Sequence, residues 1–191
     1  MPGGGGATVR ATRRFAWLAP RTTVRTVDRV LEVSATCPPF FALICTVDYV
    51  LEVPPEATVE FRADVGAVSV RGVEGALDLR TEVGDVTVAK AAGPVRVRTS
   101  TNDVSATGLG SSQVSAVTAV GDVLVDALTA PETVEARADV GDVAVRVPDG
   151  TYDVDASAGV GHVRIGVRTA VASPRRITAG TGVGDVDVGA R

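Results

Sequence analysis

Recurring aspartates are the residues of this sequence whose type and spacing first suggest chemistry. The tetrapeptide Val-Gly-Asp-Val and its variants recur along the chain, and most copies carry an aspartate at the third position. These aspartates are Asp85, Asp103, Asp122, Asp142 and Asp185. Ala67 and His162 stand at the same phase in two other copies. If the copies stack as strands at about 4.8 Å, the carboxylates form a column, which raises the hypothesis of a calcium site.

Turn carboxylates are the better interpretation of this column. Calcium-binding solenoids use a nine-residue repeat with clustered glycines, whereas each copy here carries one glycine and one aspartate. We therefore expect solvent-facing carboxylates that accept hydrogen bonds from nearby backbone N–H groups. We expect no metal site and no cofactor.

Catalytic residues do not stand out from the repeat. His162 is the single histidine, and no matching nucleophile accompanies it, so we expect a variation on a surface corner rather than a general base. Nearly all carboxylates belong to the repeat, and no acid–base pair can be singled out. The sequence thus predicts a protein that is not an enzyme. The alternative is a glycan-acting β-helix enzyme, whose mark would be two or three acidic residues that break the repeat and cluster on one face.

Two cysteines, Cys37 and Cys45, are the only ones in the chain. Their number and spacing, with one distant histidine, do not fit a four-ligand zinc site. We expect a disulfide between them, which would imply an oxidising compartment. The alternative is two unpaired cysteines that act as small apolar residues.

The residue before the aspartate indicates an unusual backbone conformation. It is glycine in six copies and asparagine in a degenerate one, and asparagine is the residue that, after glycine, best tolerates φ > 0. We therefore expect a structural corner with φ > 0 at Gly66, Gly84, Asn102, Gly121, Gly141, Gly161 and Gly184. A phosphate-binding glycine loop would need clustered glycines ahead of a helix, and no helical pattern follows any copy.

The spacing of the copies predicts the architecture. Val-x-x-Val pairs recur from Val27 to Val186 at a near-constant step, and a period of roughly 20 residues is the signature of a solenoid. The sequence predicts an all-β fold, a right-handed parallel β-solenoid (β-helix) of about nine coils with a period of about 18–20 residues. Residues 1–58 should form a divergent N-terminal cap and the first coils, because VDRVLEV at 27–33 recurs as VDYVLEV at 47–53. Residues 59–191 should form the regular coils of one continuous domain.

Within one period, LDLRTEV at 77–83 alternates as a half-buried strand does. Leu77, Leu79, Thr81 and Val83 should face the core. Arginines should form an outer column beside an acidic one, and the two columns are Arg62, Arg80, Arg98 and Arg137 and Asp64, Glu82, Ser100 and Asp139. Exposed pairs of this kind contribute roughly 0–1 kcal/mol each, so we expect them to maintain register and solubility. An anion-binding face is the alternative.

Charge and composition exclude two function classes. The net charge is −4 and aromatic residues make up 4% of the chain, so the basic, aromatic surface of a nucleic-acid binder is missing. The longest strongly apolar stretch, FFALICTV at 40–47, is far shorter than the roughly 20 residues that span a bilayer. The start, MPGGGGATVRATRR, lacks the apolar segment of a secretory signal.

The same motifs resemble a bacterial family of unknown function that is labelled an adhesin family and also described as beta-strand-repeat proteins. The resemblance rests on V-G-D-V-x-V, on the stretch from Cys37 to Pro54 and on the stretch from Ser173 to Val186, and it covers most of residues 13–191. It implies an extracytoplasmic, cell-envelope solenoid with an adhesin-like binding role or a spacer role. Its partner would be an envelope protein or a glycan. Many members carry an N-terminal membrane segment, which this sequence lacks, so a cytoplasmic location is the alternative.

Overall fold

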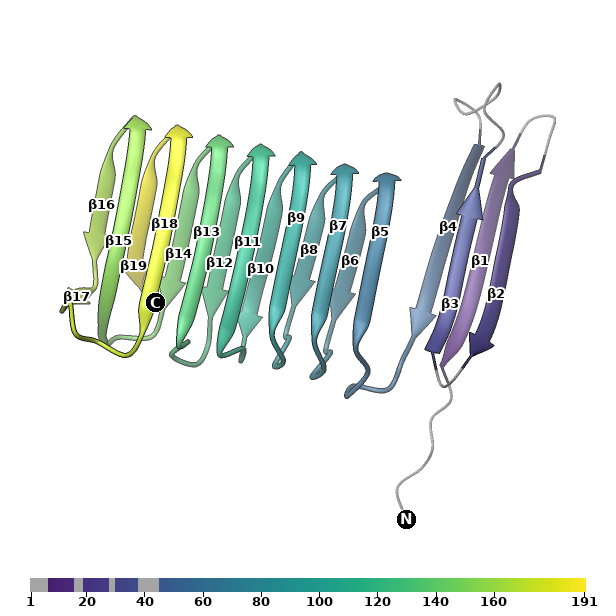
Figure 1. Ribbon diagram of the computed structural model, residues 1–191, viewed down its shortest axis with the longest axis horizontal. Coiled ribbons are helices and arrows are strands. Elements are labelled where there is room, and N and C mark those ends of the chain that lie inside the picture. Colours follow the sequence, from purple (N-terminus) through teal and green to yellow (C-terminus); the bar gives the residue numbers. More distant parts are fainter. Residues whose placement is uncertain (1–6, 16–18, 28–29, 38–44) are drawn as a thin grey trace, which may run out of the picture. The chain divides into compact units, whose positions relative to one another are not determined.

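The computed structural model describes residues 7–15, 19–27, 30–37 and 45–191 (Figure 1). Over these residues the chain is all-β and contains no helix. Accordingly, none of the described residues forms a helix that is long and apolar enough to cross a membrane. The chain divides into two compact units, Met1–Pro54 and Pro55–Arg191.

The N-terminal unit consists of antiparallel pairs. Strand β1 (Thr8–Phe15) pairs with β4 (Cys45–Glu52), and β2 (Arg21–Val27) pairs with β3 (Val30–Thr36). This pairing differs from the first parallel coils that we expected in this part of the chain.

The missing glycine explains the difference. Val47 and Val50 lie within the uninterrupted strand β4, because Asp48 and Tyr49 stand between them where the regular copies have Gly-Asp. Without a residue that readily takes φ > 0, this copy does not form the solenoid corner, and the strand runs straight on.

The second unit is a parallel β-solenoid with two strands per coil (Figure 1). The long strands are β5 (Val59–Val65), β7 (Leu77–Val83), β9 (Val95–Thr101), β11 (Gln113–Val120), β13 (Thr133–Val140), β15 (Thr151–Val160) and β18 (Arg176–Val183). The short strands are β6 (Val68–Arg71), β8 (Val86–Ala89), β10 (Val104–Leu109), β12 (Val123–Ala127), β14 (Val143–Val147), β16 (Val163–Gly166) and β19 (Val186–Ala190). These make seven coils rather than the expected nine, because the first two Val-x-x-Val copies lie in the antiparallel unit.

The coils form two sheets whose strands all pair in parallel. The long strands and the two-residue strand β17 (Arg168–Thr169) build an eight-stranded sheet, and the short strands build a seven-stranded one. The coils stack in chain order except at the C-terminal end. There β18 and β19 lie between the coil of β13–β14 and the coil of β15–β16 (Figure 1). The last strands of the chain therefore occupy the penultimate coil.

The core between the two sheets is narrow and aliphatic. Inward residues of the long strands, such as Leu79 and Ala116, and of the short strands, such as Val88 and Val125, are all buried. Tyr152 at the start of β15 is the largest buried side chain. Its hydroxyl donates a hydrogen bond of 2.9 Å to the carbonyl of Pro148. This core is consistent with a chain that is rich in valine and poor in aromatic residues.

Candidate functional site

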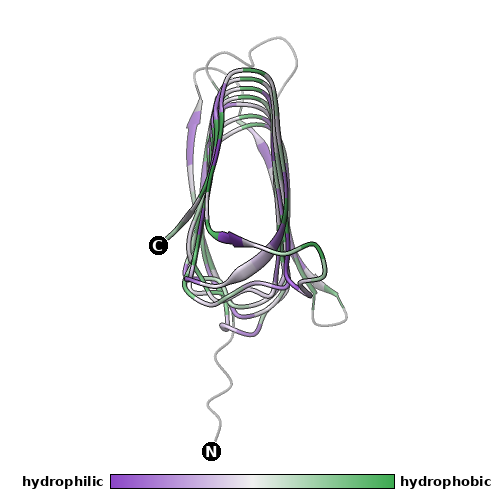
Figure 2. Cartoon of the chain, turned by 90° about the vertical axis from the view of Figure 1, so that its left-hand side faces the viewer, coloured by the Kyte–Doolittle hydropathy of each residue, from purple (hydrophilic) through white to green (hydrophobic). Residues whose placement is uncertain are grey.

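Each coil turns at a corner between its long and short strand, and this corner carries the residues that the sequence singled out. The six corner glycines have φ between 138° and 153°, and Asn102 has φ of 94°. The positive φ expected at this position is thus present in all seven coils. The corners of successive coils lie one behind another at the top of Figure 2.

Close stacking makes glycine necessary at most corners for a second reason. A Cβ added at Gly84 or Gly141 would lie under 3.0 Å from the corner carbonyl oxygen of the neighbouring coil. A Cβ at Gly66, which belongs to the first coil, would meet nothing within 4 Å. The glycine requirement therefore comes partly from the backbone conformation and partly from the neighbouring coil.

On the inside, buried threonines bind the corner of the neighbouring coil. The Thr81 hydroxyl donates to the carbonyl of Gly66 at 3.2 Å, and Thr118 donates to that of Asn102 at 3.0 Å. Thr99 and Thr181 make the same contact with the corners of their neighbours. The sequence placed Thr81 in the core, but only the stacking of coils reveals its acceptor.

On the outside, the aspartates form a hydrogen-bonded ladder. Oδ1 of Asp103 accepts the backbone N–H of Asp122 at 2.8 Å, and the same contact joins Asp122 to Asp142 and Asp142 to Asp185, also at 2.8 Å. The contact from Asp103 to Asp85 is longer, at 3.4 Å. The five side chains are exposed. They are therefore solvent-facing turn carboxylates that accept backbone N–H groups, as the sequence predicts.

His162 stands at the end of this ladder. Its backbone N–H donates to Oδ1 of Asp185 at 2.8 Å, and its Nδ1 lies 3.3 Å from the same oxygen. The backbone hydrogen bond, followed by that of the ring, lowers the pKa of Asp185 from its ordinary value of 3.8. His162 belongs to the last coil in space although not in sequence, so the ladder ends where no further coil follows.

A ridge of valines runs beside the ladder. The residue before each corner glycine is exposed, which corrects the expectation that Val83 faces the core. The exposed fractions are 79% at Val65, 43% at Val83, 50% at Val120, 47% at Val140, 48% at Val183 and 66% at Val160. Thr101 takes this place in the coil of Asn102. We call this set the valine ridge.

A threonine hydroxyl also bonds the ridge residue in several coils, although Val65, Val140 and Val160 are exposed with an alanine two residues earlier. Thr99 also bonds the carbonyl of Thr101, two residues on, at 2.9 Å, and Thr118 bonds that of Val120 at 3.3 Å. Strand alternation ends at this point, because residues 82 and 83 are both exposed after the buried Thr81. The chain thus turns its last strand residue outward as it enters the corner.

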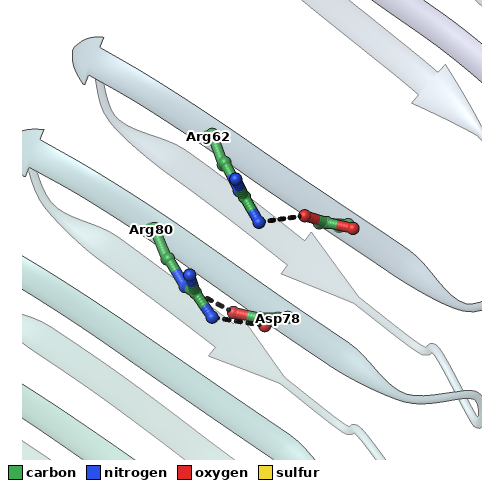
Figure 3. A network of polar contacts seen from close by, with 4 residues as sticks. Arg62, Asp78 and Arg80 are labelled. Carbon is green, nitrogen blue, oxygen red and sulfur yellow. Dashed lines mark hydrogen bonds and ion pairs between the residues drawn. The ribbon is translucent and has the colours of Figure 1, made fainter.

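The arginine column on the outer face of the eight-stranded sheet has partners other than those expected. Arg62 contacts Glu60 at 2.6 Å, Arg80 contacts Asp78 at 2.9 Å, and a third pair joins Arg137 to Glu135 at 2.9 Å. Figure 3 shows the first two arginines on neighbouring strands. Each of these three arginines pairs with the carboxylate two residues before it, whereas the fourth member of the column, Arg98, has Arg96 at that place.

The acidic residues two positions after these arginines do not pair with them within the described part of the chain. These residues are Asp64, Glu82 and Asp139. They stand next to the exposed valines. Ser100, the remaining member of the acidic column, donates a hydrogen bond of 2.8 Å to Glu82 on the neighbouring strand.

A shallow groove of about 500 Å³ crosses the starts of the long strands on this face. Its lining includes the carboxylates of Asp78 and Glu135 and the guanidinium of Arg96. Glu135 also accepts a hydrogen bond of 3.1 Å from Ser115. Both carboxylates are already hydrogen-bonded or ion-paired, which is typical of a structural surface pair.

Comparison with known families finds a match over the part of the chain that carries these corners. The family model described as Toastrack DUF4097 matches residues 56–190. The chain belongs to this family. The match covers the solenoid and leaves out the antiparallel N-terminal unit. Searches of curated proteins and of solved structures find no match.

The cysteines lie outside the Toastrack solenoid. Cys37 and Cys45 form a disulfide with a Cα–Cα distance of 5.9 Å, and it ties the end of β3 to the start of β4. This confirms the predicted pairing. Residues 38–44, which the bridge encloses, lie outside the described residues.

In the part of the chain that the structure describes, no group of three or more histidine, cysteine, aspartate or glutamate residues is placed to hold a metal ion. The acidic ladder has at most one carboxylate per coil, and one oxygen of each of its inner members accepts a backbone N–H.

Proposed function

We propose that this Toastrack chain is a non-enzymatic cell-envelope module that binds a partner through its outer surface, as the adhesin label of the resembling family suggests. The valine ridge is the observation that carries this proposal. Six valines, each at least 43% exposed, stand along a single edge, with Thr101 between Val83 and Val120. Contiguous exposed apolar surface of this kind marks interaction sites on soluble proteins.

The disulfide supports an extracytoplasmic location. Bonds such as Cys37–Cys45 persist in oxidising compartments and are rare in the cytosol. The partner is an envelope protein or a glycan, and a purely spacing role is the other form of this proposal. Seven coils at about 4.8 Å make a rigid segment on the order of 30 Å long.

Photo-crosslinking in the native envelope tests the binding role. A photoreactive residue placed at Val120 on the ridge, at Thr87 on the seven-stranded sheet or at Arg98 on the eight-stranded sheet samples three surfaces. We expect a discrete crosslinked product from at least one position. No product from any of the three would contradict binding and favour the spacer role.

Alkylation of the chain taken from its native compartment tests the location. Intact mass after alkylation without reduction should show no modified cysteine. Two alkylated thiols would place the protein in a reducing compartment and contradict the envelope proposal.

A glycan-acting enzyme is the alternative. Asp78 and Glu135 both line the groove, but they stand three strands apart in register, about 14 Å at about 4.8 Å per strand. Glycosidases act through two carboxylates roughly 5–9.5 Å apart, so the groove does not supply such a pair. Incubation with cell-wall glycans followed by reducing-end detection tests this candidate. Activity that survives purification and disappears in Asp78→Asn or Glu135→Gln would establish it, and we expect no activity.

A further inference from the structure

The valine ridge and the aspartate ladder lie side by side, and both exceed what the fold requires. In the coil of Asn102, Thr101 takes the ridge position and the corner forms all the same. Threonine has the shape of valine and is equally suited to a strand. The apolar character of the other six positions is therefore not needed to build the corner.

The charge of the ladder is likewise more than the corner needs. The contact in each step is a side-chain Oδ1 that accepts a backbone N–H. An asparagine oxygen would accept the same hydrogen bond without charge. Five carboxylates at the spacing of neighbouring strands repel one another, which opposes folding.

No cation inside the described part of the chain neutralises most of this column. Asp185 has His162 beside it, while the other four aspartates form no ion pair there. The hydrogen bonds of these four use Oδ1, so Oδ2 of each exposed carboxylate is available to a partner. The edge thus presents an apolar column and an uncompensated acidic column in parallel.

From this charge pattern we infer that the edge binds a basic amphipathic helix of a partner protein, laid along the solenoid axis. An α-helix presents one face at intervals of about 5.4 Å, close to the spacing of about 4.8 Å between coils. An extended segment presents one face about every 6.7 Å, so it loses register with the coils after fewer residues. Apolar residues of the helix would pack on the valines while lysines or arginines reach the aspartates.

Other occupants fit this edge less well. Two copies that meet through it would bring two acidic columns together, and an anionic membrane would be repelled in the same way. The inference rests on the proposed binding role and names the surface and the partner. A crosslink from a sheet face alone would support the binding role but would contradict binding through the valine ridge.

A designed probe tests the inference directly. The probe is a stapled helical peptide of about 15 residues with leucines on one stripe and lysines on the next, and its control is a scrambled peptide of the same composition. Binding to the full chain is followed by fluorescence anisotropy at low and high salt. We expect the patterned peptide to bind more tightly than the scrambled one and to lose affinity as salt rises.

Charge variants distinguish the role of the aspartate charges in binding from their role in folding. The combination Asp103→Asn, Asp122→Asn and Asp142→Asn keeps the side-chain acceptor and should weaken the probe about tenfold, because three exposed charge pairs are lost. The matched control is Glu56→Gln, Glu74→Gln and Glu132→Gln, which removes three charges from exposed loops outside the corners. It should leave affinity unchanged.

Valine variants test the contribution of the valine ridge to binding in the same way. Val120→Thr with Val140→Thr copies the natural Thr101 and should weaken the probe at every salt concentration, whereas Val171→Thr, in a loop and 92% exposed, should not. Thermal melting of each variant confirms that it is folded. Equal binding by both peptides or by both sets of variants would overturn the inference. So would a dimer of the free chain that Val120→Thr with Val140→Thr dissociates, or equal affinity for uncharged lipid vesicles.

Discussion

At the scale of single residues, a complete corner combines three groups. The residue at positive φ is glycine or asparagine, a buried threonine of the neighbouring coil donates to its carbonyl, and an aspartate outside accepts the next backbone N–H. The coils of β13–β14 and β15–β16 lack the threonine, because Ala138 and Ala158 stand in register with Thr181. Thr118 and its register partner Ala138 therefore give a test of the buried hydroxyl in both directions.

Thr118→Val should destabilise the solenoid by about 1–3 kcal/mol, because the carbonyl of Asn102 loses a donor in a buried setting. Ala138→Thr should be neutral or stabilising by up to about 1 kcal/mol, since the new hydroxyl would face the carbonyl of Gly121. Chemical denaturation measures both. A large loss of stability in Ala138→Thr would show that the core at this coil has no room for the side chain.

The corner glycines differ in how much they tolerate a methyl group. Gly66→Ala should cost roughly 1 kcal/mol for the positive φ alone, since a Cβ there meets nothing within 4 Å. Gly84→Ala should cost about 1–3 kcal/mol more, because its Cβ would collide with the corner of the first coil. Thermal unfolding compares the two. Equal losses would mean that the coils separate easily at the corner.

The carboxylate at the end of the ladder gives a prediction about pH. The pKa of Asp185 is lowered in the folded chain, so its stabilising effect is present above about pH 4 and is lost as pH falls through the lowered value. The backbone N–H of His162 is the largest cause of the shift. His162→Ala keeps that N–H and should therefore keep most of the pKa shift of Asp185. An NMR titration of the Asp185 carboxyl carbon measures this. A return to the ordinary pKa in His162→Ala would assign the effect to the ring instead.

At the scale of elements, the sequence predicted the coils well where the glycine is present. The period, the corner and the inward Leu77, Leu79 and Thr81 follow from pattern alone, since short-range sterics and alternation determine them. The prediction of a coil at Val47 and Val50 was wrong, because a Val-x-x-Val pair without glycine fits a straight strand equally well. The absence of Gly-Asp was the signal that could have separated the two cases.

The exposed valines show a second limit of pattern reading. Alternation places Val83 on the core side, but the strand end turns outward as the chain enters the corner, both where a threonine and where an alanine stands two residues earlier. Periodicity carries no information about where a strand turns into a corner. The valine ridge was thus hidden in the sequence, whereas the aspartate ladder beside it was visible because its residues break the apolar pattern.

At the scale of the whole molecule, the order of the coils was beyond prediction. Arg137, Gly180 and Ser157 lie at one phase on neighbouring strands, in that order, although Ser157 comes second in the chain. Every coil has the same phase, so each could stack on any other, and the sequence alone does not rank the choices. Ion pairs of 2.7 Å from Arg146 to Asp187 and from Arg176 to Asp153 join the inserted strands to their neighbours on both sides.

Cysteine pairs on the outer face test this order. In the full chain, Arg137→Cys with Gly180→Cys should form a disulfide, because these positions are register partners on adjacent strands. Arg137→Cys with Ser157→Cys should not, since two strand spacings, about 9.6 Å, exceed the reach of the bond. Removing residues 176–191 should reverse the second result, because the coil of β15–β16 then stacks directly on β13–β14 at the same phase. Gel mobility without reductant reads out each pair, and a bond between positions 137 and 157 in the full chain would show that the coils stack in sequence order after all.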